Sequence, residues 1–234
     1  RREKATSNIC TAQALLAIIS AAYAIYHGPE RLKNIASSIN YNTRYLKKAL
    51  EKIGYKINSV NFFDTLVIES DKAEHFFDKS VKDGINFRFI NKNKISLTID
   101  ETTTLEDIDN LISFFNSSNK KINIDNIEKD LDQVFSDKNL IRDDEILTHP
   151  IFNIYHSETE MMRYLKKLEN KDIALNRSMI PLGSCTMKLN AASEMLPITL
   201  PGFANAHPFL EKNQREGYNQ MMHELISMLK DITG

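Results

Sequence analysis

Glycine is scarce in this sequence. Seven glycines occur among 234 residues, about 3% where globular proteins usually contain ~7%. A loop that cradles a phosphate needs glycine so that its backbone can approach the ligand closely, and this chain has little material for such a loop. Tryptophan is absent, and the two cysteines, Cys10 and Cys185, are too few for a disulfide framework. That cysteine usage suits a reducing compartment.

Strong charge and long apolar runs are also lacking. The net charge is −1 with 26% charged residues, so nothing directs the chain toward nucleic acid or an anionic membrane. The longest apolar run, residues 12–25, is interrupted by Gln13 and Ser20 and is shorter than the ~20 residues of a bilayer span. The histidines, cysteines and carboxylates show no spacing typical of a metal site. We therefore expect no nucleic acid, membrane or metal partner.

Hydrophobic periodicity predicts a mixed helix and strand protein of the α/β class, with a local α+β unit. Gly28 and Pro29 should end one helix and begin the next, and Gly54 should stop the second. The capping box that begins at Ser157 should open another helix. The expected helices are residues 8–26, 29–53, 71–82, 104–115 and 158–168, one more short helix within 122–135, and one that begins at residue 211 or later and ends at 229. The expected strands are 56–61, 65–69, 85–90 and 94–99, the last two as a hairpin.

One segment, residues 179–190, fits neither helical nor strand periodicity. It contains Gly183, Ser184, Cys185 and Thr186 in a row, which can turn sharply and offer amides and hydroxyls to an anion. The alternative is a linker with ordinary turn chemistry. Near the N-terminus, the residues Thr6, Ser7 and Asn8 precede a predicted helix, so they either cap it or bind an anion there.

The segment SMIPLGSCTMKLN, residues 178–190, resembles the hallmark segment of the glycine decarboxylase P-protein family, the glycine dehydrogenases (aminomethyl-transferring) of the glycine cleavage system. Residues 2–16, 26–29, 62–66, 147–153, 155–161 and 204–209 are similar to the same family, in family order. Residues 71–142 resemble it least.

This resemblance implies a pyridoxal-phosphate transferase fold of type I. It divides the chain into residues 1–28, an interface or large-domain helix; 29–145, the small α+β domain of the N-terminal half; and 146–234, a linker and the beginning of the C-terminal half. We expect an internal fragment of a longer enzyme. The implied cofactor is pyridoxal 5'-phosphate, and the implied partners are glycine, lipoylated H-protein and further subunits in a homodimer or heterotetramer. The implied location is the cytoplasm in a bacterium, or the mitochondrion in a eukaryote.

The resemblance also makes Ser184, Cys185, Thr186, Thr6, Ser7 and Asn8 candidates for binding cofactor or substrate. In the family, the lysine that forms the Schiff base follows a histidine, and no His-Lys pair occurs in these 234 residues. We therefore assign no catalytic residue here and expect the chain alone to be inactive. A non-catalytic interaction module that lost the lysine is the alternative. His149 and His207 precede prolines, a position typical of structural hydrogen bonding.

Overall fold

The computed structural model describes residues 12–59, 61–116, 131, 140–171 and 192–234. Two compact units divide the chain: one comprises Thr11–Lys171, and the other Arg1–Cys10 with Asp172–Gly234. Among the described residues, no helix combines the length and apolar character needed to cross a membrane.

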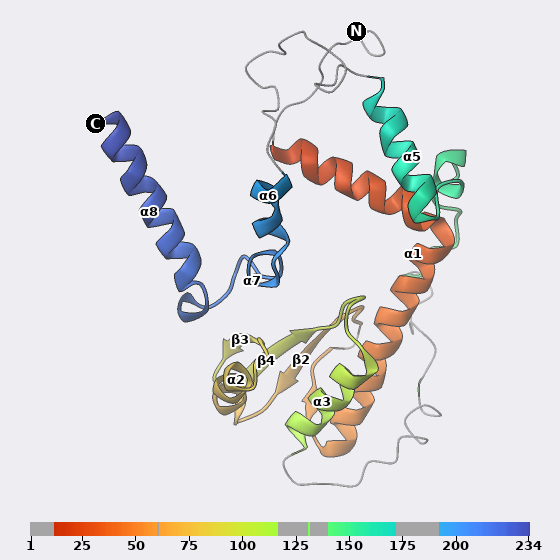
Figure 1. Cartoon of the computed structure of the whole chain (residues 1–234). Helices are drawn as coiled ribbons and strands as arrows, with labels where there is room; N and C mark the ends of the chain where they lie inside the picture. The colour runs from red at the N-terminus through yellow and green to blue at the C-terminus, as the bar shows by residue number, and fades with distance from the viewer. Residues whose placement is uncertain (1–11, 60, 117–130, 132–139, 172–191) are drawn as a thin grey trace. The chain divides into compact units, whose positions relative to one another are not determined.

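The first unit is organised by α1, Ala12–Ile53, which bends sharply part-way along (Figure 1). The bend lies at Gly28, whose φ of 66° and ψ of 179° are not helical. Only glycine adopts this combination readily, and Pro29 cannot donate the next helical hydrogen bond. The predicted boundary between two helices at Gly28 and Pro29 is therefore confirmed as a kink.

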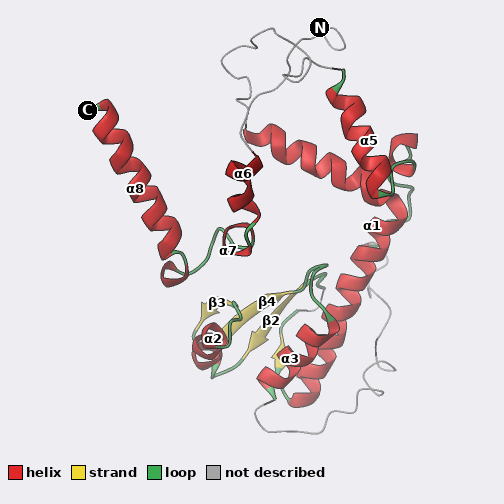
Figure 2. Ribbon diagram, viewed as in Figure 1, coloured by secondary structure: helices red, strands yellow, loops and turns green. Residues whose placement is uncertain are grey.

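A four-stranded antiparallel sheet follows α1, with the order β1-β2-β4-β3. Its strands are β1 Lys56–Ile57, β2 Thr65–Glu69, β3 Arg88–Asn91 and β4 Lys94–Thr98, and Figure 2 shows them in yellow. The strand predicted at 65–69 and the predicted hairpin are confirmed. The strand predicted at 56–61 is shorter, although Asn58 N still donates to Val67 O at 3.1 Å.

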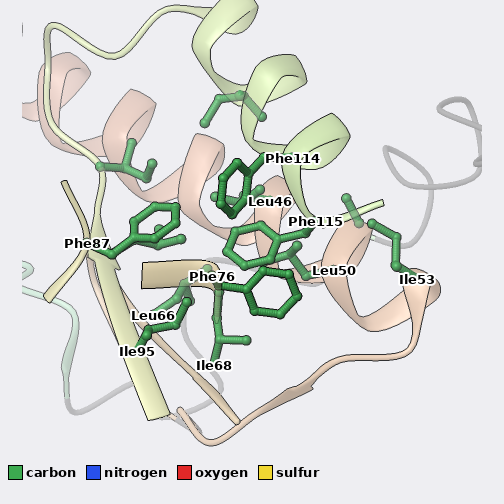
Figure 3. Packing of buried hydrophobic residues seen from close by; sticks show 14 of the residues in the cluster. Leu46, Leu50, Ile53, Leu66, Ile68, Phe76, Phe87, Ile95, Phe114 and Phe115 are labelled. Carbon is green, nitrogen blue, oxygen red and sulfur yellow. The ribbon is translucent and has the colours of Figure 1, made fainter. Parts of the chain in front are cut away.

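Two helices, α2 (Ala73–Lys82) and α3 (Leu105–Phe115), complete this part of the unit. The hydrophobic core lies where the second half of α1, α2, α3 and the sheet meet, and Figure 3 shows its packing. Four phenylalanines gather there with ring centroids 5.0–6.0 Å apart in tilted, edge or stacked pairs, namely Phe76, Phe87, Phe114 and Phe115. Aliphatic side chains from α1, β2 and β4 surround them, including Leu46, Leu50, Leu66, Ile68 and Ile95.

The first unit ends with a short 3-10 helix η3, Pro150–Asn153, and the helix α5, Glu158–Glu169. The second unit contains α6 (Ala192–Met195), η4 (Leu196–Thr199), α7 (Pro201–Ala204), η5 (Lys212–Gln214) and α8 (Glu216–Thr233). The helix predicted at 158–168 is confirmed. The helix predicted from residue 211 or later to residue 229 is confirmed as α8, which begins at Glu216 after the 3-10 turn η5 and continues to Thr233. The helix predicted at 122–135 falls almost entirely outside the described residues.

Candidate functional site

The six predicted binding residues belong to two segments, one near the N-terminus and one within residues 179–190. Thr6, Ser7 and Asn8, and likewise Ser184, Cys185 and Thr186, lie outside the described residues. Their roles stay predictions. The described part of the first unit instead brings together three other family-like segments, residues 26–29, 149–153 and 155–157, around the kink of α1.

This kink junction consists of Tyr26, Gly28, Arg31, Phe152 and His156. The backbone at Gly28 packs so closely that a Cβ atom there would lie 2.5 Å from the carbonyl oxygen of Phe152 and 2.7 Å from Cε1 of His156. No side chain can be added at such distances without displacing backbone. The segment 150–156 is thus fitted against a glycine 122 or more positions earlier in the chain, as the contact between α1 and η3 also shows.

Two hydrogen bonds cross the kink junction. His156 Nδ1 lies 2.8 Å from the carbonyl oxygen of Tyr26, and Arg31 Nη1 donates to the carbonyl oxygen of His156 at 3.2 Å. A carbonyl can only accept, so Nδ1 of His156 must carry the proton. The guanidinium of Arg31 also lies 5.9 Å from the ring centroid of Tyr26. The bonds therefore tie His156 to α1 on both sides of Gly28.

Immediately after His156, Ser157 begins α5 with a capping box. Its hydroxyl accepts from Glu160 N, while Glu160 accepts from Ser157 N at 3.2 Å. The hydrogen bond from the Ser157 hydroxyl holds the pKa of Glu160 below its usual range. Because its own carboxylate satisfies this helix start, α5 is not poised to bind an external anion there. The rings of Tyr155 and Tyr164 stack 4.2 Å apart against the same turn.

The two histidines that precede prolines act as local hydrogen-bond acceptors, as predicted. His149 Nδ1 accepts from Ile151 N at 3.1 Å, and His207 Nδ1 accepts from Phe209 N at 3.0 Å. Both rings therefore have an unprotonated Nδ1, the opposite of His156. Among the described residues, no group of three or more histidines, cysteines or carboxylates is arranged to hold a metal ion.

A polar cavity of about 670 Å³ lies between α2, α3 and the end of β4. Lys79, which lines this cavity, forms an ion pair with Asp83, and its Nζ lies 3.9 Å from the ring centroid of Phe114. The positive charge of Lys79 is therefore balanced within the unit. Asp100 and Asp107 accept hydrogen bonds from neighbouring threonines. Those side-chain bonds lower the pKa of both carboxyls. These two carboxylates of the cavity therefore stabilise the turn before α3 and the cap at the start of that helix.

The described residues do not fit pyridoxal phosphate. Lys47, a largely buried lysine with a side chain 20% exposed, is held by Glu51 and by the carbonyl of Ser59. The space beside Gly28 is filled by Phe152 and His156, so it cannot admit a phosphate, and nothing lies near the Cβ position of Gly84 to form a cradle.

Comparison with known proteins gives the family. The glycine cleavage system P-protein model matches residues 1–115. These residues are similar to the glycine cleavage system P-protein family and make up just under half of the chain. Proteins named glycine dehydrogenase (decarboxylating) from Escherichia coli, Escherichia fergusonii and Shigella sonnei are each 50% identical to the chain over 236 aligned residues. The resemblance read from the motifs is thereby confirmed.

These matches cover 100% of this chain and 25% of each relative. The chain thus spans about a quarter of the length of the relatives it matches. The kink junction is formed by segments that resemble the P-protein family, but the motifs did not reveal that residues 26–29 meet residues 150–156. Arg31 was missed, since a lone arginine at the start of a helix carries no distinguishing pattern. A single sequence contains no signal for a contact between positions so far apart.

Proposed function

We propose that the chain forms part of a glycine decarboxylase of the P-protein type. Such an enzyme removes CO2 from glycine and passes the aminomethyl group to the lipoyl arm of H-protein. Pyridoxal phosphate supplies the electron sink for the decarboxylation. The observation that carries the proposal is the 50% identity to glycine dehydrogenase (decarboxylating) along the whole chain. The ordered series of family motifs from residue 2 to residue 209 supports the same proposal.

Within this proposal, the chain contributes residues that line the active site but does not contribute the lysine that binds the cofactor covalently. The absence of a His-Lys pair from the sequence supports an assignment of the cofactor lysine to residues outside these 234. Ser184, Cys185 and Thr186, with Thr6, Ser7 and Asn8, are the proposed contacts to cofactor or substrate. The proposed architecture is the type I transferase fold divided at residues 28 and 145. The proposed setting is a dimer or heterotetramer in the bacterial cytoplasm, or in mitochondria for a eukaryotic parent.

A chimera tests the proposal. The matched quarter of the Escherichia coli glycine dehydrogenase is replaced by these 234 residues, and release of labelled CO2 from carboxyl-labelled glycine is measured with lipoylated H-protein. We expect activity within about tenfold of the parent, a loss of less than ~1.4 kcal/mol in transition-state stabilisation. A second chimera with Ser184, Cys185 and Thr186 changed to alanine should lose more. A folded chimera that binds pyridoxal phosphate but releases no CO2 would refute the proposal and favour the interaction module.

The chain alone tests the lysine assignment. Mixed with pyridoxal phosphate, it should show no absorbance band of a lysine-bound cofactor. Borohydride reduction followed by peptide mass mapping should find no specific adduct. A single stoichiometric adduct on Lys188, the lysine within the 178–190 segment, would overturn the assignment.

A further inference from the structure

The two halves of α1 are joined by a sequence that does not fix their angle. Gly28 has a positive φ, and a glycine can populate many backbone conformations. Pro29 provides no N–H to continue the helical ladder, so the carbonyl of Ile25 loses its usual partner at position 29. A Gly-Pro break permits a bend without specifying which one. The single bend seen in α1 must therefore be selected by contacts from elsewhere.

The kink junction supplies contacts to both halves from one short segment, and the hydroxyl of Tyr23 in the first half also donates to Glu101 at 3.4 Å. Carbonyls at the end of a helix need donors from outside that helix, and His156 Nδ1 provides one to Tyr26 at 2.8 Å. Tyr26 belongs to the half before the kink. Arg31 belongs to the half after it and donates to the backbone carbonyl of the same residue, His156, at 3.2 Å. One residue thus bonds to both halves of α1.

The close packing at Gly28 restricts the position of His156. Phe152 O and the His156 ring both lie against the glycine, where a Cβ would collide with them. The position of His156 is fixed from the other side as well, because the capping box of Ser157 and Glu160 follows immediately and anchors α5. A rigid helix start, a glycine surface and two hydrogen bonds therefore converge on His156.

We propose that His156 is a capping residue that, with Arg31 and Gly28, latches the angle between the two halves of α1. The latch fixes the direction of residues 12–27, whose exposed surface is mainly apolar, relative to the core that packs against the second half of α1. Without it, the first half swings about Gly28 while the core stays folded, because the core residues belong to the second half and the elements packed against it. This inference is independent of the proposed decarboxylase function.

A distance measurement between spin labels tests the latch in the full chain. One label is placed at Ser20 on the first half of α1 and the other at Asp109 on α3; both positions are exposed. The native Cys10 and Cys185 are changed to serine so that only the engineered cysteines react. The unsubstituted junction should give one narrow distance distribution. His156→Ala, which removes the Nδ1 donor, should broaden that distribution at least about twofold through local opening.

Two matched variants separate the hydrogen bond from general disturbance. His156→Asn keeps an N–H donor at the position of Nδ1 and should retain the narrow distribution. His75→Ala removes an exposed histidine from α2, away from the kink junction, and should also leave the distribution narrow. Far-UV circular dichroism of each variant checks that the core remains folded.

Three results would overturn the latch: a distribution in His156→Ala as narrow as in the unsubstituted chain, one in His156→Asn as broad as in His156→Ala, or equal broadening in His75→Ala. Should His156→Ala fail to fold, Arg31→Gln decides the matter by removing the guanidinium, and with it the second bond and the contact with the ring of Tyr26. A broadened distribution in Arg31→Gln supports the latch, and an unchanged one refutes it.

Discussion

The two halves of α1 reverse the usual relation between hydrophobicity and burial. Residues 12–27 contain no Asp, Glu, Lys or Arg, yet Leu16 is 67% exposed and Ile18 is 61% exposed. The second half contains six lysines and arginines between residues 31 and 52. It nevertheless buries Leu46, Ala49 and Leu50 completely. The more polar half supplies the core, and the more apolar half does not.

Periodicity explains the difference. In the second half, buried side chains recur at positions 46, 49, 50 and 53, the spacing of a single helical face. That face meets the sheet and the phenylalanine cluster (Figure 3). In the first half, apolar residues occupy nearly every side, so no one face is selected. Amphipathic spacing identifies the face that packs within this unit, whereas uniform hydrophobicity indicates only that a helix is suited to an apolar environment.

The strongest test of this comparison truncates one leucine in each half. Leu50→Ala should lower the free energy of unfolding of the core by about 2–5 kcal/mol, because it leaves a cavity in a fully buried site. Leu16→Ala should change it by no more than about 0.5 kcal/mol, since the side chain is largely exposed. Urea unfolding followed by far-UV circular dichroism measures both. Equal losses in the two variants would show that the first half is part of the same cooperative core.

The same contrast marks how far the sequence predicts the structure. Local chemistry was sufficient for β2, with its alternating burial, for α5, with the capping box at Ser157, and for the break at Gly28 and Pro29. The contact between Gly28 and Phe152 was not predictable, because it joins residues 124 positions apart and depends on tertiary packing. The length of β1 was overestimated for a related reason, since strand ends depend on pairing with a neighbour. The predicted binding residues, including Ser184, stay predictions outside the described part of the chain.

A substitution at the kink should have the next largest effect on stability. Gly28→Ala places a side chain at a φ of 66° and against Phe152 and His156, which should destabilise the native kink by about 1–3 kcal/mol. Gly84→Ala is the matched control, because Gly84 has a φ of 76° but nothing within 4 Å of its Cβ position. Hydrogen exchange at the amides around residues 26–31 and 80–85 measures the local cost. A loss at Gly28 no greater than at Gly84 would mean that the close packing contributes nothing.

A capping box begins both α3, which packs in the core, and α5, which lies beside the kink of α1. Thr104 begins α3 and Ser157 begins α5, each with a reciprocal side-chain and backbone pair. Thr104→Ala and Ser157→Ala should each cost about 1 kcal/mol of helix stability. Thr104→Ala should lower the unfolding midpoint of the core, because α3 carries Ile108, Phe114 and Phe115 into it. Ser157→Ala should mainly increase hydrogen exchange of the α5 amides. If Ser157→Ala lowered the unfolding midpoint of the core as much as Thr104→Ala does, α5 would belong to the same cooperative unit as the core.

The smallest effect is the pH dependence of the cap of α3. A side-chain hydrogen bond from Thr104 holds the pKa of Asp107 below its ordinary value, and the backbone N–H of Thr104 lowers it further. Because the folded pKa is below the unfolded one, Asp107 contributes stability above the unfolded pKa of about 4. This contribution disappears as the pH falls through the folded pKa, because the carboxylate must then be protonated.

Asp107→Asn should therefore reduce the loss of core stability between neutral pH and pH 3, and Thr104→Val should reduce it as well by removing the hydroxyl donor. The measurement is the urea midpoint of each variant at a series of pH values. At neutral pH, both variants should be less stable than the unsubstituted chain, and the differences should narrow toward pH 3. A constant difference across the whole range would show that the cap acts through geometry and not through the carboxylate charge.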